Sequence, residues 1–155
     1  MAEYVSVGTQ TVNPGESVVY NIAVVPCTRG LVRPRLGSGN INLKGWVPTN
    51  YGCGCNCNRN ANYLVEFGAN IAIPDGETIG PISLAFALDG GTIEASSMSA
   101  APTVTEAFSN VSRTKNIPVL NGCCQTLTVR NTSSIPILVS DPSIVISRPD
   151  LAITR

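Results

Sequence analysis

The sequence predicts an all-β fold, an antiparallel jelly-roll sandwich of about ten short strands with little helix. Three observations lead to this prediction. Polar and apolar residues alternate along most of the chain, as they do in half-buried strands. Turn-forming Gly, Pro, Asn and Asp residues recur about every ten residues. No stretch carries apolar residues at the helical period of about 3.6.

The first sixty residues are predicted to form short strands and one long loop. A first β run over residues 4–12 ends at Asn13-Pro14-Gly15, where Pro presets the first turn angle and Gly accepts a positive φ. Further strands are expected at Ser17–Val25, at Arg29–Arg35 before the break Gly37-Ser38-Gly39, and from Ile41 to Trp46. The polar residues 48–60 are predicted to form a loop.

The strongest strands are predicted in the middle of the chain. Tyr63–Ile73 alternates in the manner of a strand with one buried face. Ile82–Leu88 is apolar on both faces, which suits a central strand covered on both sides. Asp89-Gly90-Gly91 has hairpin chemistry and leads into Thr92–Ala95.

The remaining residues are predicted to form a loop at Ser96–Thr103, a strand marked by Val104, Phe108 and Val111, and two hairpins. Asn121-Gly122 is typical of the type I′ turn that would join Ile117–Leu120 to Cys123–Arg130. Ile135–Val139 and Ser143–Ser147 form the last pair, separated by Asp141-Pro142.

An immunoglobulin-type sandwich is the alternative fold. It would have about seven strands and a buried Trp between two paired cysteines. Trp46 does lie between Cys27 and Cys123. The strand count nevertheless favours the jelly roll.

Length and composition predict one domain spanning residues 1–155, because the chain has no repeat and no linker. Lys+Arg and Asp+Glu number ten each, so no basic field recruits nucleic acid. No apolar run approaches the roughly 18 residues that cross a bilayer. Met1-Ala2-Glu3-Tyr4 lacks a basic signal-peptide start, so folding in a cytoplasm is expected.

Most catalytic chemistry is not expected. The chain has no histidine, which removes Ser-His-Asp and Cys-His sites and His-ligated metal. The carboxylates are scattered, and only Asp75 and Glu77 lie within two residues of each other. An enzyme with such a carboxylate pair is the third and weakest hypothesis. We therefore expect no enzymatic activity, no cofactor and no metal.

Six cysteines are unusual in a chain that shows no secretory signal. They are Cys27, Cys53, Cys55, Cys57, Cys123 and Cys124. The spacing C-x-C-x-C at residues 53–57 differs from the C-x2-C knuckles of structural zinc sites. Disulfides are the first expectation, free or variably oxidised thiols the second, and metal the last. The cysteines suggest a protein that is made inside a cell and works outside it.

A series of short motifs resembles small jelly-roll domains of the tumour-necrosis-factor/C1q type in Firmicutes bacteria and their phages. The series comprises Val5–Val12 with Asn13-Pro14-Gly15, Pro26–Gly30, Gly37–Gly39, Phe67–Pro74, Gly80–Ala85, Leu88–Gly90 and Gly122–Cys124. Each motif is a turn-and-strand pattern of low specificity, and their order carries the resemblance. Cys53 and Cys55 are additions to the pattern.

The resemblance implies a homotrimer on the outside of a particle. We expect a virion surface protein of a phage, a capsid decoration protein, head fibre or fibre knob, made in the host cytoplasm without a signal peptide. Its partners would be further copies of itself and a major capsid or fibre protein. The tip domain of a spore-surface filament, on the spore surface, is the alternative; its usual collagen-like stalk would need a Gly-X-Y period, which the sequence lacks.

A carbohydrate- or receptor-binding module is the second hypothesis. Its contact surface would be the polar loop of residues 51–60, and its ligand a host-surface glycan. The contact residues would be Tyr51, Asn56, Asn58, Arg59 and Asn60.

Overall fold

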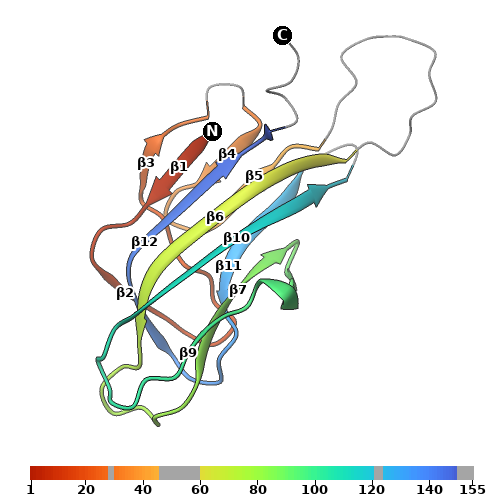
Figure 1. Ribbon diagram of the computed structural model, residues 1–155. Coiled ribbons are helices and arrows are strands. Elements are labelled where there is room, and N and C mark those ends of the chain that lie inside the picture. The colour runs from red at the N-terminus through yellow and green to blue at the C-terminus, as the bar shows by residue number, and fades with distance from the viewer. Residues whose placement is uncertain (28–29, 46–59, 121–123, 150–155) are drawn as a thin grey trace, which may run out of the picture.

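The structure is a computed structural model that describes residues 1–27, 30–45, 60–120 and 124–149. Within these residues, twelve strands form two antiparallel sheets of six strands each, packed face to face (Figure 1). One short 3-10 helix, η1 (Glu94–Ser96), is the helical element of this part of the chain. The prediction of an all-β jelly roll with little helix is confirmed.

The first sheet has the strand order β10-β6-β12-β1-β3, and β2 pairs with β12 beyond the end of β1. Its strands are β1 (Ala2–Val5), β2 (Thr9–Val12), β3 (Ile22–Val25), β6 (Ala61–Ala72), β10 (Ser109–Val119) and β12 (Ile137–Ser147). The long strands β6 and β10 pair without interruption from Ser109 opposite Ile71 to Val119 opposite Ala61.

The second sheet has the order β4-β5-β11-β7-β8, and β9 also pairs with β7. Its strands are β4 (Val32–Arg35), β5 (Asn40–Leu43), β7 (Ile82–Leu88), β8 (Gly91–Thr92), β9 (Met98–Ala100) and β11 (Gln125–Asn131). Pro34 lies in the edge strand β4, where its missing N–H breaks no ladder.

The chain changes sheets between successive long strands. β5 lies in the second sheet, β6 in the first, β7 in the second, β10 in the first, β11 in the second and β12 in the first. Neighbours in the sequence therefore face each other across the sandwich, and strands distant in sequence pair side by side. This alternation makes the sandwich a jelly roll.

The core fills the space between the sheets, and alternation along each strand supplies it. Along β6 the side chains of Tyr63, Val65, Phe67 and Ile71 are buried, while Glu66 is exposed. β7 contributes Leu84 and Phe86 from the opposite sheet, and β12 contributes Ile137, Val139, Ile144 and Ile146. The half-buried strand predicted at Tyr63–Ile73 is confirmed.

Two predicted hairpins do not form. β10 and β11 lie in different sheets, β10 against β6 and β11 between β5 and β7. Of the residues predicted to form the last pair, 137–139 and 143–147 belong to one continuous strand, β12, whose register shifts between Ser140 and Ser143. Asp141-Pro142 therefore marks a β-bulge within a strand, because β12 pairs with β6 up to Ser140 and again from Ser143 onward.

The segment predicted as one strand at Ser17–Val25 is divided between the sheets. The amide of Val18 donates to the carbonyl oxygen of Val129 at 2.8 Å, so this part follows β11 of the second sheet. Ile22–Val25 pairs with β1 of the first sheet. The chain thus crosses the edge of the sandwich between the two parts.

Two other predictions are confirmed. β7 is buried on both faces, since Ala85 and Ala87 on its outer side are as inaccessible as Leu84 and Phe86. Asp89 and Gly90 both have positive φ, 49° and 83°, and close the β7–β8 hairpin. β9 was not anticipated, because its short polar sequence was predicted to be loop.

Candidate functional site

The loop singled out for ligand contact lies outside the described residues, except for its last position. Asn60 is exposed directly before β6. Tyr51, Asn56, Asn58 and Arg59 fall outside, as do Cys53, Cys55, Cys57 and Cys123. Their roles stay predictions from the sequence.

Two of the six cysteines are described, and they lie at the same end of the sandwich. Cys27 follows β3, half-buried against the core, and Cys124 is exposed directly before β11. Val25 pairs with Glu3 near the start of β1, and Gln125 pairs with Leu43 at the end of β5. Both positions belong to the end at which β5 finishes and β6 begins (Figure 1).

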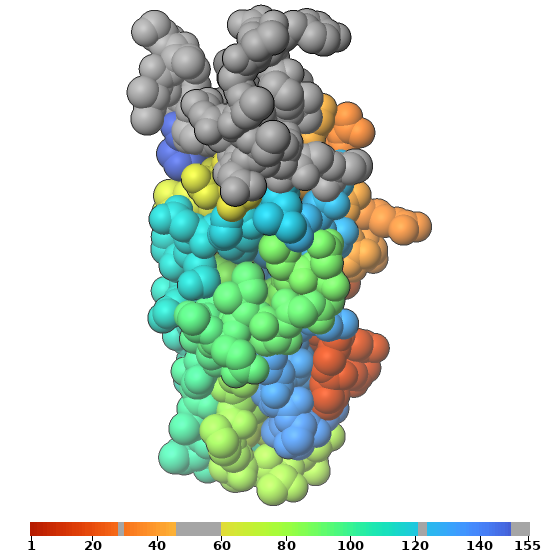
Figure 2. Space-filling view, turned by 90° about the vertical axis from the view of Figure 1, so that its right-hand side faces the viewer, coloured from red at the N-terminus to blue at the C-terminus, as the bar shows by residue number. Residues whose placement is uncertain are grey.

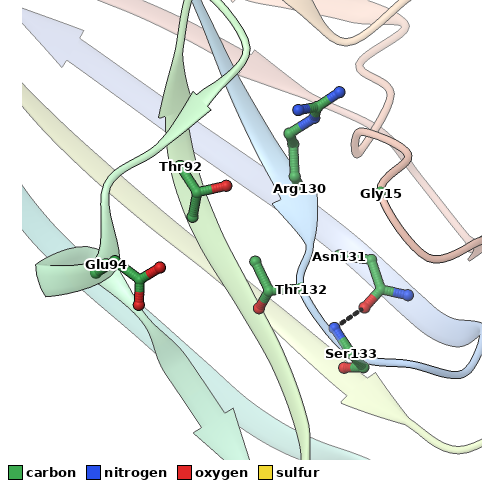
Figure 3. A pocket seen from close by; sticks show the side chains of 7 residues that line it. All are labelled: Gly15, Thr92, Glu94, Arg130, Asn131, Thr132 and Ser133. Carbon is green, nitrogen blue, oxygen red and sulfur yellow. Dashed lines mark hydrogen bonds between the residues drawn. The ribbon is translucent and has the colours of Figure 1, made fainter.

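A polar cleft of about 380 Å³ opens on the outside of the second sheet. It is lined by Gly15, Thr92, Glu94, Arg130, Asn131, Thr132 and Ser133 (Figure 3). In Figure 2 the green segment around residue 90, the blue segment after β11 and the red segment before residue 20 meet on one face. Three parts of the chain that are distant in sequence therefore build the cleft.

The walls of the cleft are fixed by backbone hydrogen bonds. On one side, the amide of Ile93 donates to Phe86 O at 2.8 Å, which holds the chain between Thr92 and Glu94 against β7. On the other side, the amide of Gly15 donates to Asn131 O at 2.9 Å. The cleft is therefore held open by the sheet and does not depend on side-chain contacts across it.

The floor of the cleft is a closed hydrogen-bond network. The Nδ2 of buried Asn131 donates to Val12 O and Ile135 O, both at 2.9 Å. Its Oδ1 accepts from the amide of Ser133 at 2.8 Å. The Ser133 Oγ in turn accepts from the amide of Ser83 at 2.8 Å. These groups are occupied in holding the chain and leave little capacity for a ligand.

Thr132 is also bound to the neighbouring strand. Its hydroxyl lies 2.6 Å from that of Ser83 on β7. The groups with capacity to bind a ligand are therefore those of Arg130, Thr92 and Glu94.

Arg130 projects from β11 on the outer face of the second sheet, next to Ala85 of β7. Its Nη1 donates to Gly90 O at 3.0 Å, a bond to the β7–β8 turn. Its Nε is buried and has no acceptor among the described residues. Thr92 and Glu94 reach the same cleft from the opposite wall (Figure 3). This arrangement places a guanidinium, a hydroxyl and a carboxylate around one polar space.

A second feature is an apolar stripe on the outer face of the first sheet, made of Ile22, Val5, Val145 and Leu64. Val5 pairs with Ile22 on one side and with Ser143 on the other, and Val145 lies two residues beyond Ser143. Leu64 pairs with Ser147, two residues further along β12. Cross-strand partners share a face, so the four side chains form a diagonal across β3, β1, β12 and β6.

The stripe corrects one expectation about β12. The run Ile144-Val145-Ile146 is apolar on both faces of a strand, so the sequence predicts that Ile144 or Ile146 faces outward and contributes to the trimer interface. Both isoleucines are fully buried in the core. Val145, half-buried, is the outward residue, with Glu3 and Glu66 directly opposite it on either side.

Sequence reasoning did not single out Arg130, Thr92 or Glu94. The available signal was a charged residue on the polar face of an alternating strand, where it follows Thr126 and Thr128. Alternation placed Arg130 on the outer face, but the hairpin that lies beside it comes from a different part of the chain.

The carboxylates considered for catalysis lie on a turn. Asp75 and Glu77 follow β6, and the amide of Glu77 donates to Pro74 O at 3.3 Å. The described residues hold no group of three His, Cys, Asp or Glu side chains arranged to bind a metal ion. They also include no helix long and apolar enough to cross a membrane.

The sequence matches no protein-family model. It also matches none of the curated proteins.

Solved structures do resemble the fold. The globular domain of zebrafish complement 1qA superimposes with a TM-score of 0.56 at 11% identity, over 93% of this chain and 94% of that one. The Eiger tumour necrosis factor of S. frugiperda superimposes with a TM-score of 0.56 at 12% identity, over 95% of this chain and 90% of that one. At such identities the likeness concerns the fold alone. The chain has the C1q/TNF-type jelly-roll fold expected from the motif order.

Proposed function

We propose that this chain is a non-enzymatic structural protein on the surface of a phage particle, where it assembles as a homotrimer. It would serve as a capsid decoration protein, head fibre or fibre knob, in contact with a capsid or fibre protein. The apolar stripe on the first sheet is the observation that carries the assembly. The phage setting rests on the order of the sequence motifs, with the spore surface as the alternative setting.

The stripe has the properties of an interface between copies. Ile22 is 44% exposed, and its neighbours Val5, Val145 and Leu64 are half-buried. An apolar face left open on a single copy favours aggregation, and a closed cyclic assembly covers it without leaving an open end. The choice of three copies over two comes from the family resemblance.

The carboxylates of Glu3 and Glu66 make this interface sensitive to salt. They flank Val145 in each copy, so assembly brings carboxylates of different copies toward each other. Added salt screens their repulsion. The proposal therefore predicts that the trimer dissociates less readily at high than at low ionic strength.

Light scattering after size exclusion at micromolar concentration tests the assembly. The unmodified chain should have about three chain masses, and Val145→Asp should lower this to one. Asn42→Asp is the matched control, because Asn42 is exposed on the other sheet and Asp keeps the oxygen that accepts from Thr126. A folded, soluble monomer for the unmodified chain would refute the trimer.

The phage setting is tested by the neighbouring reading frames in the genome. Capsid, portal or tail genes beside this one support a virion protein. Genes of spore coat formation there would move the proposal to the spore surface.

A carbohydrate- or receptor-binding module is the second candidate function. The polar cleft at Arg130 favours it, because Arg130, Thr92 and Glu94 line one cleft and keep hydrogen-bonding capacity that the packing of the sandwich does not use. A glycan array separates the two functions, since a pure decoration protein should retain no glycan.

A further inference from the structure

We propose that the polar cleft binds an acidic saccharide, a sugar ring that carries one carboxylate beside its hydroxyl groups. This inference rests on the second proposed function and names its ligand class. The hydrogen bonds of Arg130 and the side chains across the cleft from it support this ligand class.

The Nε side of the Arg130 guanidinium makes no hydrogen bond among the described residues. Its Nη1 is occupied by Gly90 O at 3.0 Å, whereas the buried Nε meets no acceptor among the described residues. Within the same part of the chain, no ion pair joins Arg130 to Glu94, although both line the cleft. The guanidinium is thus bonded to a neutral carbonyl oxygen and has no anionic partner among the described residues.

The geometry of a guanidinium selects a carboxylate for the Nε side. Nε and the neighbouring Nη form a planar fork whose spacing matches the two oxygens of a carboxylate. A buried N–H without an acceptor is unfavourable, so an oxygen that reaches it is favoured. Because Nε is buried, the guanidinium has to turn toward the cleft for this fork to reach the ligand.

The opposite wall suits hydroxyl groups. Thr92 and Glu94 project into the cleft from the segment after the β7–β8 turn (Figure 3). A threonine hydroxyl both donates and accepts hydrogen bonds, and a carboxylate accepts hydrogen bonds from ligand hydroxyls. The charge of Glu94 also repels a second anionic group. The ligand therefore carries one carboxylate with hydroxyls next to it.

The lining disfavours a neutral sugar. None of the seven lining residues is aromatic. Small-ligand sites usually gain most of their contact area from apolar and aromatic side chains. In this cleft the charge of Arg130 has to supply most of the affinity. A neutral sugar has no charge to pair with it.

The cleft stays open in the proposed trimer. It lies on the outer side of the second sheet, whereas the apolar stripe lies on the outer side of the first. Its volume of about 380 Å³ is that of a site for a small ligand. Binding and assembly can therefore be tested separately.

The test is an NMR titration of the full-length ¹⁵N-labelled chain with glucuronate, glucose and acetate. We expect glucuronate to shift the amides of Thr92, Arg130 and Thr132, with an affinity about tenfold above that for glucose or acetate. Equal binding of glucose would overturn the role of the charge. Equal binding of acetate would reduce the cleft to a simple anion site and overturn the saccharide.

Variants of Arg130 test whether its guanidinium fork binds the ligand. Arg130→Gln should weaken glucuronate binding about tenfold or more. Arg130→Lys keeps the charge without the fork and should also lose most of the affinity, which covers the case that the Gln variant does not fold. Arg35→Gln, an exposed arginine on the edge strand β4 of the same sheet, should leave binding unchanged.

Glu94→Gln tests the opposite wall. Removing its charge should strengthen acetate binding and reduce the preference for glucuronate over acetate. An unchanged preference would contradict the role given to Glu94. If the light-scattering mass stays trimeric while no ligand shifts these amides, the cleft proposal fails and the structural function stands.

Discussion

The amide nitrogen of Gly8 donates a hydrogen bond of 2.8 Å to Oδ1 of Asp141, a residue 133 positions later. The amide of Asp141 donates in return to Gly8 O at 3.0 Å. The pair lies where the register of β12 shifts between Ser140 and Ser143. On one side of this point β12 pairs with β2, and on the other with β1. The two bonds therefore hold the β1–β2 connection against the bulge of β12.

Asp141 should make the stability of the protein depend on pH in the acid range. The amide of Gly8 and the hydroxyl of Ser140 lower the pKa of this carboxyl below its ordinary value. A carboxylate with a lowered pKa stabilises the fold above its unfolded pKa, about 3.9, and loses this contribution as the pH falls through the folded pKa. Urea unfolding at pH 7 and in steps below pH 4 measures the loss.

Two variants at Asp141 separate charge from backbone strain. Asp141→Asn keeps an acceptor oxygen and tolerates the φ of 48°, so it should lose only the part that depends on the charge. Its deficit relative to the unmodified chain should shrink as the pH falls. Asp141→Ala loses the acceptor and strains the backbone, so its deficit should be larger and persist at low pH. A pH-independent deficit for the Asn variant would contradict the role of the charge.

Removing the hydroxyl should affect the free energy of unfolding differently at two buried tyrosines. The Tyr20 hydroxyl is buried with no partner among the described residues, and this burial raises the pKa of the phenol. Tyr63 donates to Lys44 O at 2.6 Å, which ties the two sheets together. Tyr20→Phe should leave the free energy of unfolding unchanged or raise it by about 1 kcal/mol, whereas Tyr63→Phe should lower it by about 1 kcal/mol.

Denaturant unfolding of both tyrosine variants checks this prediction. Each variant is the control for the other, since both remove one oxygen from a buried ring. An equal loss in the two variants would mean that the Tyr20 hydroxyl has a partner.

Gly39 should tolerate alanine far less than Gly37, although both lie in the β4–β5 turn with positive φ, 71° and 81°. A β-carbon at Gly39 would overlap the carbonyl oxygen of Val18, whereas one at Gly37 meets no atom within 4 Å. Gly37→Ala should cost about 1 kcal/mol of unfolding free energy, from backbone strain alone. Gly39→Ala should cost at least about 3 kcal/mol, because the Val18 backbone has to move. Similar melting temperatures for the two variants would contradict the close approach.

Asn131 should be among the polar residues most costly to replace. Its side chain satisfies Val12 O, Ile135 O and the amide of Ser133 at once. Asn131→Ala removes hydrogen bonds to three backbone groups, one buried and two partly buried, so we expect a loss of about 3 kcal/mol in denaturant unfolding. Asn42→Ala, on the exposed outer face, should cost no more than about 0.5 kcal/mol.

The cysteines at positions 53, 55 and 57 should change state with the redox environment. Three thiols within five residues of a Gly- and Asn-rich segment are easily oxidised when they are accessible. Thiol counting on unfolded protein, with and without reductant, should find fewer than six free thiols after exposure to air. Six free thiols would contradict the disulfide hypothesis, and tightly bound zinc in the purified protein would replace it.

The sequence by itself determined the β class, the jelly-roll sandwich and several local features. Alternation along Tyr63–Ile73 predicted β6 and its buried face. Successive side chains of a strand point to opposite faces of the sheet, regardless of which strands pair with it. Asp89-Gly90 predicted its hairpin, because the positive φ values needed there are a property of those two residues.

Only the tertiary structure decided which strands pair and where the cleft lies. Asn121-Gly122 predicted a hairpin, yet β10 and β11 belong to opposite sheets, and Asp141-Pro142 lies in a bulge instead of a turn. Backbone hydrogen bonds are nearly the same for any partner strand, so local sequence does not specify the partner. The position of the cleft also depends on which strands pair. Arg130 meets Thr92 and Glu94 only because the chain crosses between the sheets before β11 takes its place beside β7.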